Sequence, residues 1–441
     1  MQDIKTESDV VSSFDDEQKR ALNAILDQCL STDEFIFPIV DGPPGTGKTT
    51  VGTASVRELL REDPKSQVLY MCYTNFAAER ARESLGKLGL GPDQVIRLTP
   101  NPRDRNWSEG VVGFKHDFSD LSANDLRRLK SCPVLLCTLH SSRRGIQNRR
   151  AGARLIVDEF SQVDPGMFFA TINRVRNCNP DGYALLGDPK QLPVITTQPL
   201  LRPNIAAFVM RRKPYTPHKL VTQHRMHEDI CAAVNSLRTA LGTYMICSGE
   251  EVKERDLVAL GYTWDRNSVP ENYRAIIDPQ HPLVLVNSDK LSGGEEQTFR
   301  GSWRNVAEAK LAAKLTRLIC ESYKDSEGPL NDIAILSPYA AQVVEIRQNL
   351  PTDLQSRCAT IYKAQGREYH CVVLSFVRSN PEGFIGFLEE SELKAQTYVA
   401  CSRAEAKLIV VLSFQTFFGK SHKDFDYLNE TKTAFKFEGP L

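Results

Sequence analysis

The segment 37–50, FPIVDGPPGTGKTT, constrains the fold of this chain more than any other. Gly42 to Thr49 fits the pattern GxxxxGK[ST], in which glycines let backbone N–H groups point into one concavity that holds phosphate oxygens. An apolar run precedes the loop and a helix-like segment, TTVGTASVRELL, follows it. A helix N-terminus favours the same negative charge. A chance glycine-rich turn would lack this context, so we predict a strand–loop–helix unit that binds a nucleoside triphosphate.

The residues of this loop have separate expected roles. Lys48 should reach the β- and γ-phosphates, and Thr49 should ligate Mg²⁺. The whole nucleotide-binding stretch consists of Gly42, Pro43, Pro44, Gly45, Thr46, Gly47, Lys48, Thr49 and Thr50.

A phosphate loop also needs a carboxylate for the metal and a group that orients the attacking water. The stretch LIVDEFSQ places Asp158 and Glu159 at the end of an apolar strand, where a parallel sheet presents residues to its ligand crevice. We expect Asp158 to hold Mg²⁺ through water and Glu159 to act as the base or water orienter. An isolated Asp-Glu pair is usually a solvated turn, but the phosphate loop favours the functional interpretation.

Two further glutamines are candidates for the nucleotide site. Gln191, in LLGDPKQLP after a third strand, could sense the γ-phosphate. Gln18, in FDDEQKRAL before the phosphate strand, could recognise an adenine edge with its amide. Taken alone, either would be an ordinary turn or surface residue.

Apolar runs alternate with helical patterns along most of the chain. Continuous rather than alternating apolar runs suit parallel strands that are covered on both faces. We expect strands at 35–40, 67–73, 133–139, 154–160, 183–188, 282–288, 332–337, 371–377 and 407–413, and helices that include 303–324 and 340–350. The length of 441 residues suits two domains. We therefore predict an α/β fold with two tandem parallel-sheet domains, at 1–217 and 218–441.

Composition narrows the class of protein further. The net charge is zero, so any basic surface must be local. The eleven cysteines form no CxxC pair, which favours a reducing compartment over a metal knuckle or disulfide framework. The N-terminus is polar and no apolar run reaches membrane-spanning length. We expect an intracellular protein, cytoplasmic or nuclear, with no membrane contact.

The second half carries motifs that identify a family. It contains VTQHRMHED (221–229), ILSPYAAQ (335–342), TIYKAQGREYHCVVLSFV (360–377) and YVACSRAEAKLIVV (398–411). With the phosphate loop, DEFSQ and GDPKQL, these resemble the ordered motifs of a superfamily 1 helicase of the up-frameshift/senataxin-like branch. The resemblance runs from about Asp15 to Ser413. It implies two RecA-like P-loop NTPase domains that use ATP and Mg²⁺.

The resemblance also implies roles for residues of the second half. Arg225 and Arg403 would reach the γ-phosphate across an interdomain cleft and neutralise charge during phosphoryl transfer. Glu368 would contact the ribose, and His224 would stack on adenine in place of the family's tyrosine. Gln342 and Arg367 would support the closed cleft.

Charge distribution and the resemblance together suggest where nucleic acid would bind. The tracts 126–157 and 189–227 contain eight and seven Lys/Arg residues and no acid, which is typical of a groove that follows phosphates. A basic run is otherwise a solvated face. The candidate contacts, by family position or by charge, are Thr74, Asn75, Thr138, Arg149, Arg150, Pro338, Tyr339 and Thr360.

The leading hypothesis is an ATP-dependent helicase or translocase on single-stranded RNA or DNA, with 5′→3′ polarity implied by the family. We expect it to act as a monomer, with ribonucleoprotein partners a possibility. An ATP-gated clamp that remodels a ribonucleoprotein without unwinding is the alternative, and a degenerate scaffold is a third. A GTPase would need an Asn-Lys-x-Asp motif that the chain lacks, and a ring ATPase would rarely carry the QGRE and SRA motifs.

Departures from the family pattern concern coupling to the strand. Tyr362 and Ala364 replace an acid and an aromatic residue in TIYKAQG, and Tyr398 stands where the family often has asparagine. The sequence also begins close to Gln18, without the barrel-like accessory domain of the family. We therefore expect an active ATPase that unwinds long duplexes weakly.

Overall fold

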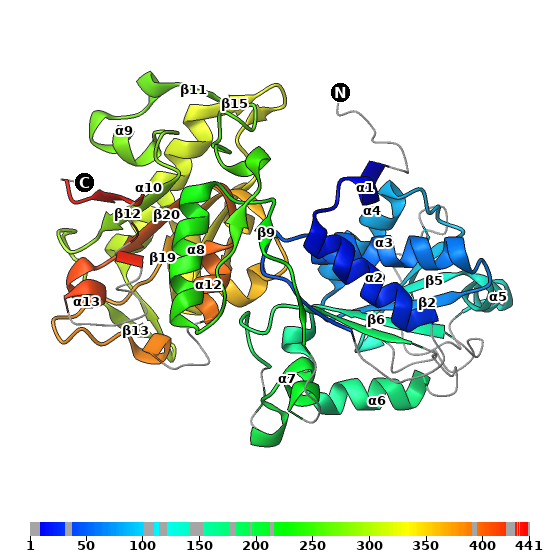
Figure 1. Ribbon diagram of the computed structural model, residues 1–441. Helices are drawn as coiled ribbons and strands as arrows, with labels where there is room; N and C mark the ends of the chain where they lie inside the picture. Colours follow the sequence, from blue (N-terminus) through cyan, green and yellow to red (C-terminus); the bar gives the residue numbers. More distant parts are fainter. Residues whose placement is uncertain are drawn as a thin grey trace. The chain divides into compact units, whose positions relative to one another are not determined.

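A computed structural model, shown in Figure 1, describes residues 9–30, 38–100, 110–113, 121–141, 153–175, 182–194, 196, 198–211, 216–389, 395–419, 428–429, 431 and 433–439. The chain divides into two compact units. The first unit comprises Met1–Pro189 and Pro193–Thr222, and the second comprises Lys190–Leu192 and Gln223–Leu441.

The first unit is built on an eight-stranded sheet whose paired strands are all parallel. Its strands are β1 (Ile39–Asp41), β2 (Gln67–Cys72), β3 (Val95–Thr99), β4 (Val111–Gly113), β5 (Val134–Thr138), β6 (Ala153–Asp158), β7 (Tyr183–Gly187) and β8 (His218–Lys219). They lie in the order β4-β3-β5-β2-β6-β7-β1-β8. The apolar runs predicted β1, β2, β5, β6 and β7, but they did not predict β3, β4 and β8.

Helices cover both faces of this sheet, which explains why its strands are continuously apolar. On one face of β2, the side chains of Val68, Tyr70 and Cys72 pack in a hydrophobic cluster with three helices. These helices are α2 (Asp16–Leu30), α3 (Lys48–Glu62) and α4 (Asn75–Lys87). The alternate residues Leu69 and Met71 pack on the opposite face with α5 (Ala123–Ser131), α6 (Pro165–Val175) and α7 (Ile205–Met210). Figure 1 shows α2 and α3 on one side of the strands and α6 and α7 on the other. A short helix, α1 (Asp9–Ser12), precedes α2.

The second unit contains a six-stranded sheet that is also parallel at every pairing. Its strands are β12 (Leu283–Asn287), β17 (Ile333–Ser337), β18 (Cys358–Thr360), β19 (Tyr369–Ser375), β20 (Ala404–Leu412) and β21 (Phe435–Phe437), in the order β18-β17-β19-β20-β12-β21. Small sheets accompany it, formed by β9 (Thr222–Gln223) with β10 (Cys247–Ser248), by β11 (Thr263–Trp264), β15 (Tyr323–Asp325) and β16 (Gly328–Pro329), and by β13 (Gln297–Phe299) with β14 (Ser302–Arg304).

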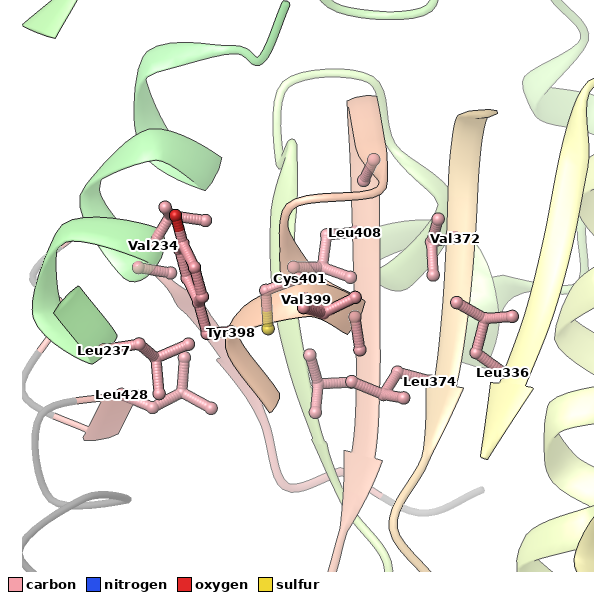
Figure 2. Packing of buried hydrophobic residues seen from close by; sticks show 14 of the residues in the cluster. Val234, Leu237, Leu336, Val372, Leu374, Tyr398, Val399, Cys401, Leu408 and Leu428 are labelled. Atoms are coloured by element: carbon pink, nitrogen blue, oxygen red, sulfur yellow. The ribbon is translucent and has the colours of Figure 1, made fainter. Parts of the chain in front are cut away.

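Helices again cover both faces of this second sheet. One face packs against α8 (Glu228–Ala240), α12 (Ala395–Cys401) and α13 (Phe414–Phe418), and the other against α9 (Glu271–Ile277), α10 (Val306–Ser322) and α11 (Ala340–Gln348). Figure 2 shows the first of these interfaces, where Val234 and Leu237 of α8 and Val399 of α12 lie beside the strand residues Leu374 and Leu408. Removing these side chains from water supplies the main stabilisation of the unit.

The predicted fold class is confirmed: the chain is α/β, with two tandem parallel sheets. The helix expected at 303–324 begins later, at Val306, because Asn305 caps it by accepting a hydrogen bond from Glu308 N at 3.0 Å. The beginning of the strand expected at 35–40 lies outside the described residues. In the part of the chain that the structure describes, no helix has the length and hydropathy needed to cross a bilayer.

Candidate nucleotide-binding site and strand-contact surface

The phosphate loop lies at the carboxyl edge of the first sheet, between β1 and α3. Asp158 ends β6, and the segment with Gln191 follows β7, which lies between β6 and β1 in the sheet. Register pairs Asp158 with Leu186 and Asp41 with Gly187, so the three motifs leave adjacent strands at the same edge. Residues that are more than 100 positions apart in sequence are thereby brought to one place.

Glycines give the loop a shape that side chains would block. Gly45 and Gly47 have φ of 80° and 82°, a region that favours glycine. A Cβ atom on Gly42 would lie 2.4 Å from Cγ of Lys48. Lys48 folds over the loop, and its Nζ donates a hydrogen bond to the carbonyl of Pro43 at 3.2 Å. The lysine therefore lies over the concavity that was predicted to hold phosphate.

Gln18 contacts the loop from α2. Its Oε1 accepts from Asp15 N at 3.2 Å while Asp15 Oδ1 accepts from Gln18 N at 2.7 Å, a reciprocal cap of the helix. Its Nε2 donates to the carbonyl of Thr46 at 3.2 Å, and a Cβ on Gly47 would lie only 2.6 Å from that nitrogen. The structure thus gives Gln18 a role in shaping the loop; recognition of adenine by Gln18 stays a prediction.

The predicted metal ligands Thr49 and Asp158 lie side by side. Thr49 Oγ1 donates to Oδ2 of Asp158 at 2.9 Å, and Asp158 is fully buried. The same Oδ2 accepts from the hydroxyl of Tyr70 at 2.9 Å. Burial, followed by the charge of Asp158, raises the pKa of Tyr70, so its hydroxyl stays protonated and donates. Sequence reasoning missed Tyr70, because a tyrosine inside the apolar run VLYMCY carries no signal of its own.

Glu159 has an unusual backbone conformation. Its φ of 63° lies in the left-handed region, and its N–H donates to Oδ1 of Asp158 at 2.9 Å. Such conformations in residues other than glycine concentrate at functional sites. The side chain of Glu159 is half-buried, and Gln191 is buried with 6% of its surface exposed. The catalytic roles assigned to both stay predictions.

The second unit brings its own predicted nucleotide residues together at the amino ends of β19 and β20. Register pairs Tyr369 with Ala404, so Glu368 and Arg403, one position earlier on each strand, become neighbours. Arg225 forms an ion pair with Glu368 and donates to the carbonyl of Ser402 at 3.0 Å. Burial and the charge of Glu368 raise the pKa of Glu405 at the same edge.

Arg403 is held more tightly than Arg225. Only 2% of its surface is exposed. Its guanidinium donates to the carbonyls of Val399 and Arg367 at 2.9 and 3.2 Å and to Ser402 Oγ at 3.1 Å. Arg367, expected to support a closed cleft, therefore contributes its backbone carbonyl to the positioning of Arg403.

The segment after α8, for which the sequence indicated no chemistry, supports the Arg225 motif. Arg255 Nη1 donates to the carbonyls of His224 and Arg225 at 3.3 and 3.1 Å. Glu251 Oε1 lies 2.6 Å from His224 Nδ1, and Gly249 N donates to the carbonyl of Gln223 at 2.9 Å. These contacts cross irregular backbone, so no periodic pattern could have predicted them. Stacking of His224 on adenine stays a prediction.

Gln342 has a structural environment that corrects its expected role. It is fully buried, its Oε1 accepts from Asn305 N at 2.8 Å, and its Nε2 donates to the carbonyl of Asn305 and to Ser375 Oγ. The amide therefore anchors the start of α10 inside the second unit. Its expected role came from the family resemblance, and a motif position does not reveal the direction of the side chain.

The strand-contact candidates of the first unit lie at the carboxyl ends of β2 and β5. Thr74 caps α4 by accepting from Ala77 N at 3.1 Å, and Asn75 next to it is exposed. Thr138 is 5% exposed and its Oγ1 accepts from Ser141 N at 3.1 Å. Beside them Tyr73 and His140 form an edge-to-face pair with ring centroids 5.8 Å apart. Nucleic-acid contact by this group stays a prediction.

The remaining strand candidates differ in what they could present. In the second unit, Pro338 and Thr360 are half-buried at the carboxyl ends of β17 and β18. Tyr339 is only 3% exposed, and burial raises the pKa of its hydroxyl; contact of this residue with a strand stays a prediction. Arg149 and Arg150 lie outside the described residues.

Two arginines of the first basic tract are paired with residues of other segments. Arg128 forms an ion pair with Asp93 at 2.8 Å, and Arg154 lies 3.7 Å from Asp63 and donates to Ser66 Oγ at 2.9 Å. Absence of acids within a tract therefore does not leave its cations unpaired, since partners come from other segments.

Comparison with known proteins decides the family. Two family models, each described as an AAA domain, match residues 30–197 and 205–414. The DNA replication ATP-dependent helicase/nuclease dna2 of Schizosaccharomyces pombe is 26% identical over 395 residues, covering 86% of this chain and 27% of that protein. The regulator of nonsense transcripts 1 homolog of Neurospora crassa is 26% identical, covering 85% of this chain and 35% of that protein. The chain belongs to the superfamily 1 helicases of the up-frameshift-like branch.

This helicase core spans roughly a quarter to two-fifths of the length of the curated relatives it matches. The human DNA replication ATP-dependent helicase/nuclease DNA2, for example, is 27% identical over 91% of this chain and 37% of its own length. The crystal structure of Pif1 helicase from Candida albicans aligns over 94% of this chain and 99% of that chain, at 14% identity and a TM-score of 0.40.

The helicase core has residues that fit ATP and Mg²⁺. The loop from Gly42 to Lys48 encloses a concavity, which a Cβ atom on Gly42 would fill. The loop leads directly into the N-terminus of α3, which favours negative charge. A hydroxyl and a carboxylate, from Thr49 and Asp158, meet beside it. The described residues contain no group of three or more His, Cys, Asp or Glu that could cage a metal. One carboxylate with one hydroxyl suits Mg²⁺, which keeps waters and shares phosphate oxygens rather than taking an all-protein cage.

Proposed function

We propose that the chain is an ATP-dependent helicase or translocase that hydrolyses ATP and uses the energy to move on single-stranded RNA or DNA. The observation that carries the proposal is the hydrogen bond of 2.9 Å between Thr49 and Asp158 beside the phosphate loop. It joins two motifs 109 positions apart into the arrangement that nucleotide hydrolysis requires. The names of the curated relatives, which include ATP-dependent helicases, support the same conclusion.

The residues of the first unit would act as follows. Backbone N–H groups of the loop and Nζ of Lys48 hold the β- and γ-phosphates, while Thr49 and Asp158 would hold Mg²⁺. Bound Mg²⁺ supplies charge neutralisation on the phosphate oxygens. Glu159 orients the attacking water and accepts its proton. The left-handed backbone at Glu159 fixes the direction in which its side chain leaves the sheet.

The residues of the second unit would stabilise charge that develops on the γ-phosphate. Arg225 and Arg403 are the two cations for this role, and Glu368 would bind the ribose. In the second unit as it stands, Arg225 is paired with Glu368. We propose that ribose binding by Glu368 weakens this pair and releases the guanidinium for the phosphate. Arg403, already held by three hydrogen bonds, needs no such release.

Finer aspects of the function rest on the family alone. We propose 5′→3′ movement, monomeric action and, as further partners, ribonucleoproteins. Strand contact would run over the carboxyl edges of the sheets, through Thr74, Asn75 and Thr138 in the first unit and Pro338 and Thr360 in the second. Contacts of this kind grip sugar and phosphate and carry little sequence preference.

The test measures ATP hydrolysis with and without single-stranded RNA and DNA. We expect strong stimulation by at least one strand, and loss of hydrolysis in Lys48→Ala. Lys324→Ala, which removes an exposed lysine from β15, is the matched control and should hydrolyse ATP like the parent. ATP-dependent strand binding without turnover would favour the clamp instead. Absence of both turnover and strand binding would contradict the proposal.

A further inference from the structure

The hairpin of β13 and β14 ends in an unusual turn. Phe299 pairs with Ser302, so the turn consists of Arg300 and Gly301, whose φ values are 50° and 74°. Two positive φ values define a hairpin turn that normally holds glycine, asparagine or aspartate. Arg300 is exposed and occupies the first of these positions. A strained arginine at an exposed tip indicates a function for its side chain rather than for the turn.

Aromatic rings and guanidinium groups alternate around this hairpin. The guanidinium carbons of Arg300 and Arg304 lie 5.2 and 4.3 Å from the ring centre of Phe299. Arg378 lies 4.4 Å from the ring centre of Trp303 and 5.3 Å from that of Phe384, whose surface is 56% exposed. Stacks of this composition are typical of surfaces that bind unpaired bases and phosphates.

These three cations differ in whether a carboxylate among the described residues pairs with them. Arg304 pairs with Glu345 at 3.0 Å. Arg378 pairs with Glu296 through two hydrogen bonds of 2.9 and 2.8 Å. Arg300 has no carboxylate partner among the described residues of the second unit. Arg304 and Arg378 therefore hold the rings in place, and Arg300 carries the uncompensated charge.

The hairpin borders the proposed strand-contact edge of the second sheet. Ser302 Oγ accepts from Ala341 N at 3.3 Å. Ala341 lies in the first turn of α11, shortly after Pro338, which follows β17. Phe384 lies in the loop that follows β19, the next strand of the sheet, and Asn380 closes this loop through two hydrogen bonds of 2.8 Å to the backbone of Phe384. Two rigid segments thus flank the carboxyl edge.

We propose that this surface, the hairpin 297–304 with Phe384, is a contact site for single-stranded nucleic acid. Arg300 pairs with a backbone phosphate, and the exposed ring of Phe384 stacks on a base. The inference rests on the proposed function, because it assigns a further part of the strand path. Base stacking and phosphate pairing are both independent of sequence, as a motor that advances along any strand requires.

The test compares strand binding by Arg300→Asn and Phe384→Ala with the parent. Asparagine tolerates the left-handed conformation, so Arg300→Asn removes the charge and keeps the turn. Lys324→Asn removes the same charge from β15 and is the control. Fluorescence anisotropy with labelled 20-nucleotide poly(U) and poly(dT), at several salt concentrations, gives affinity and salt dependence, and thermal melting checks folding.

We expect Arg300→Asn to weaken binding about tenfold and to reduce the log–log salt slope by about 0.7, the value for one phosphate contact on a single strand. Phe384→Ala should weaken binding about fivefold or more, with an unchanged salt slope. Lys324→Asn should bind like the parent. Parent affinity in both folded variants would overturn the hairpin assignment alone. A parent protein that binds neither strand would overturn the proposed function, and the hairpin assignment with it.

Discussion

The hydroxyl of Tyr70 donates a hydrogen bond to Oδ2 of Asp158, the same oxygen that accepts from Thr49. This contact fixes the orientation of the carboxylate that we assign to Mg²⁺. Gly52 makes it possible, because a Cβ at that position would lie 2.7 Å from the tyrosine oxygen. Tyr70 would thus orient the proposed metal ligand through a second hydrogen bond, as outer hydrogen-bond partners commonly do.

We predict that Tyr70→Phe weakens Mg²⁺ binding and leaves the chemistry intact. The Mg²⁺ concentration for half-maximal ATP hydrolysis should rise about tenfold or more, the usual effect of losing such a partner. Turnover at saturating Mg²⁺ should stay within a few-fold of the parent. Tyr323→Phe, which removes another buried hydroxyl bonded to the carbonyl of Ile277, is the control for loss of stability. An unchanged Mg²⁺ dependence would contradict the assignment.

Lys48 and Glu159 should separate binding from hydrolysis. Lys48→Ala removes the cation over the loop, so ATP affinity should fall sharply. Glu159→Gln keeps the size of the side chain but cannot accept a proton, so ATP should bind normally while hydrolysis stops. Binding of a fluorescent ATP analogue and release of phosphate measure the two steps. Near-normal turnover in Glu159→Gln would remove Glu159 from the catalytic role.

The sequence predicted those parts of the fold that depend on local pattern. Buried parallel strands such as β6 and β20 read as continuous apolar runs, and loop residues such as Gly42 and Lys48 have a spacing that phosphate binding imposes. The edge strands β4 and β21, each of three residues, were not predicted, because neither lies in a longer apolar run as β1 does. Side-chain direction was equally hidden, as the buried Gln342 and Tyr339 show.

Contacts between distant segments formed the second class of features that the sequence could not reveal. The hydrogen bonds of Tyr70 with Asp158 and of Arg255 with the His224 carbonyl connect segments through the folded chain. Neither follows from the spacing of motifs. The pairing of Arg225 with Glu368 joins two predicted site residues that lie 143 positions apart in sequence.

Glu308 should make the stability of the second unit depend on pH. Burial raises the pKa of this carboxyl from an ordinary 4.5 to about 8, although Val377 N and Ser375 Oγ donate hydrogen bonds to it. Between these values the folded protein binds more protons than the unfolded chain, so the free energy of unfolding falls as pH rises. The favourable contribution is full below about pH 4.5 and is lost by about pH 8.

We therefore predict that Glu308→Gln flattens the pH profile of thermal stability between about pH 5 and pH 8. This interval lies between the ordinary pKa of a glutamate and the raised pKa of Glu308. Glutamine can still accept from Val377 N, and its amide group can donate to Ser375 Oγ. Glu321→Gln removes an exposed carboxyl from the same helix and should leave the profile of the parent. Melting temperatures at constant ionic strength measure the effect. Equal slopes for Glu308→Gln and the parent would contradict this prediction.

Arg255 should act on hydrolysis by positioning the backbone that carries Arg225. Its guanidinium holds the carbonyls of His224 and Arg225, so Arg255→Ala should let Arg225 move. We predict about a tenfold lower kcat with a smaller change in KM, which is a loss of roughly 1.4 kcal/mol in transition-state stabilisation. Arg255→Lys should recover part of the rate. Arg266→Ala, at an exposed position of the same segment, is the control, and an equal loss there would point to general destabilisation.

The buried guanidinium of Arg403 could act in ATP hydrolysis, in stabilising the fold, or in both. Its guanidinium is 2% exposed and makes hydrogen bonds to Val399, Arg367 and Ser402, so it also stabilises the amino edge of β20. Arg347 provides a comparison, because it donates to the carbonyl of Cys358 at 2.6 Å within the same unit and has no assigned role in hydrolysis. Truncation of Arg403 removes donors from the carbonyls of Val399 and Arg367, and truncation of Arg347 removes one from the carbonyl of Cys358.

We predict that Arg403→Ala lowers turnover by roughly 10³–10⁵, as loss of an arginine finger does, while ATP affinity falls much less. Arg347→Ala, at an exposed position, should lower the melting temperature less and leave turnover within a few-fold of the parent. Arg403→Lys should restore folding without restoring the rate, because an ammonium group cannot reproduce the planar guanidinium contacts. Turnover near the parental value in folded Arg403→Ala would leave Arg403 a purely structural role, and Arg225 would then be the single arginine of the γ-phosphate site.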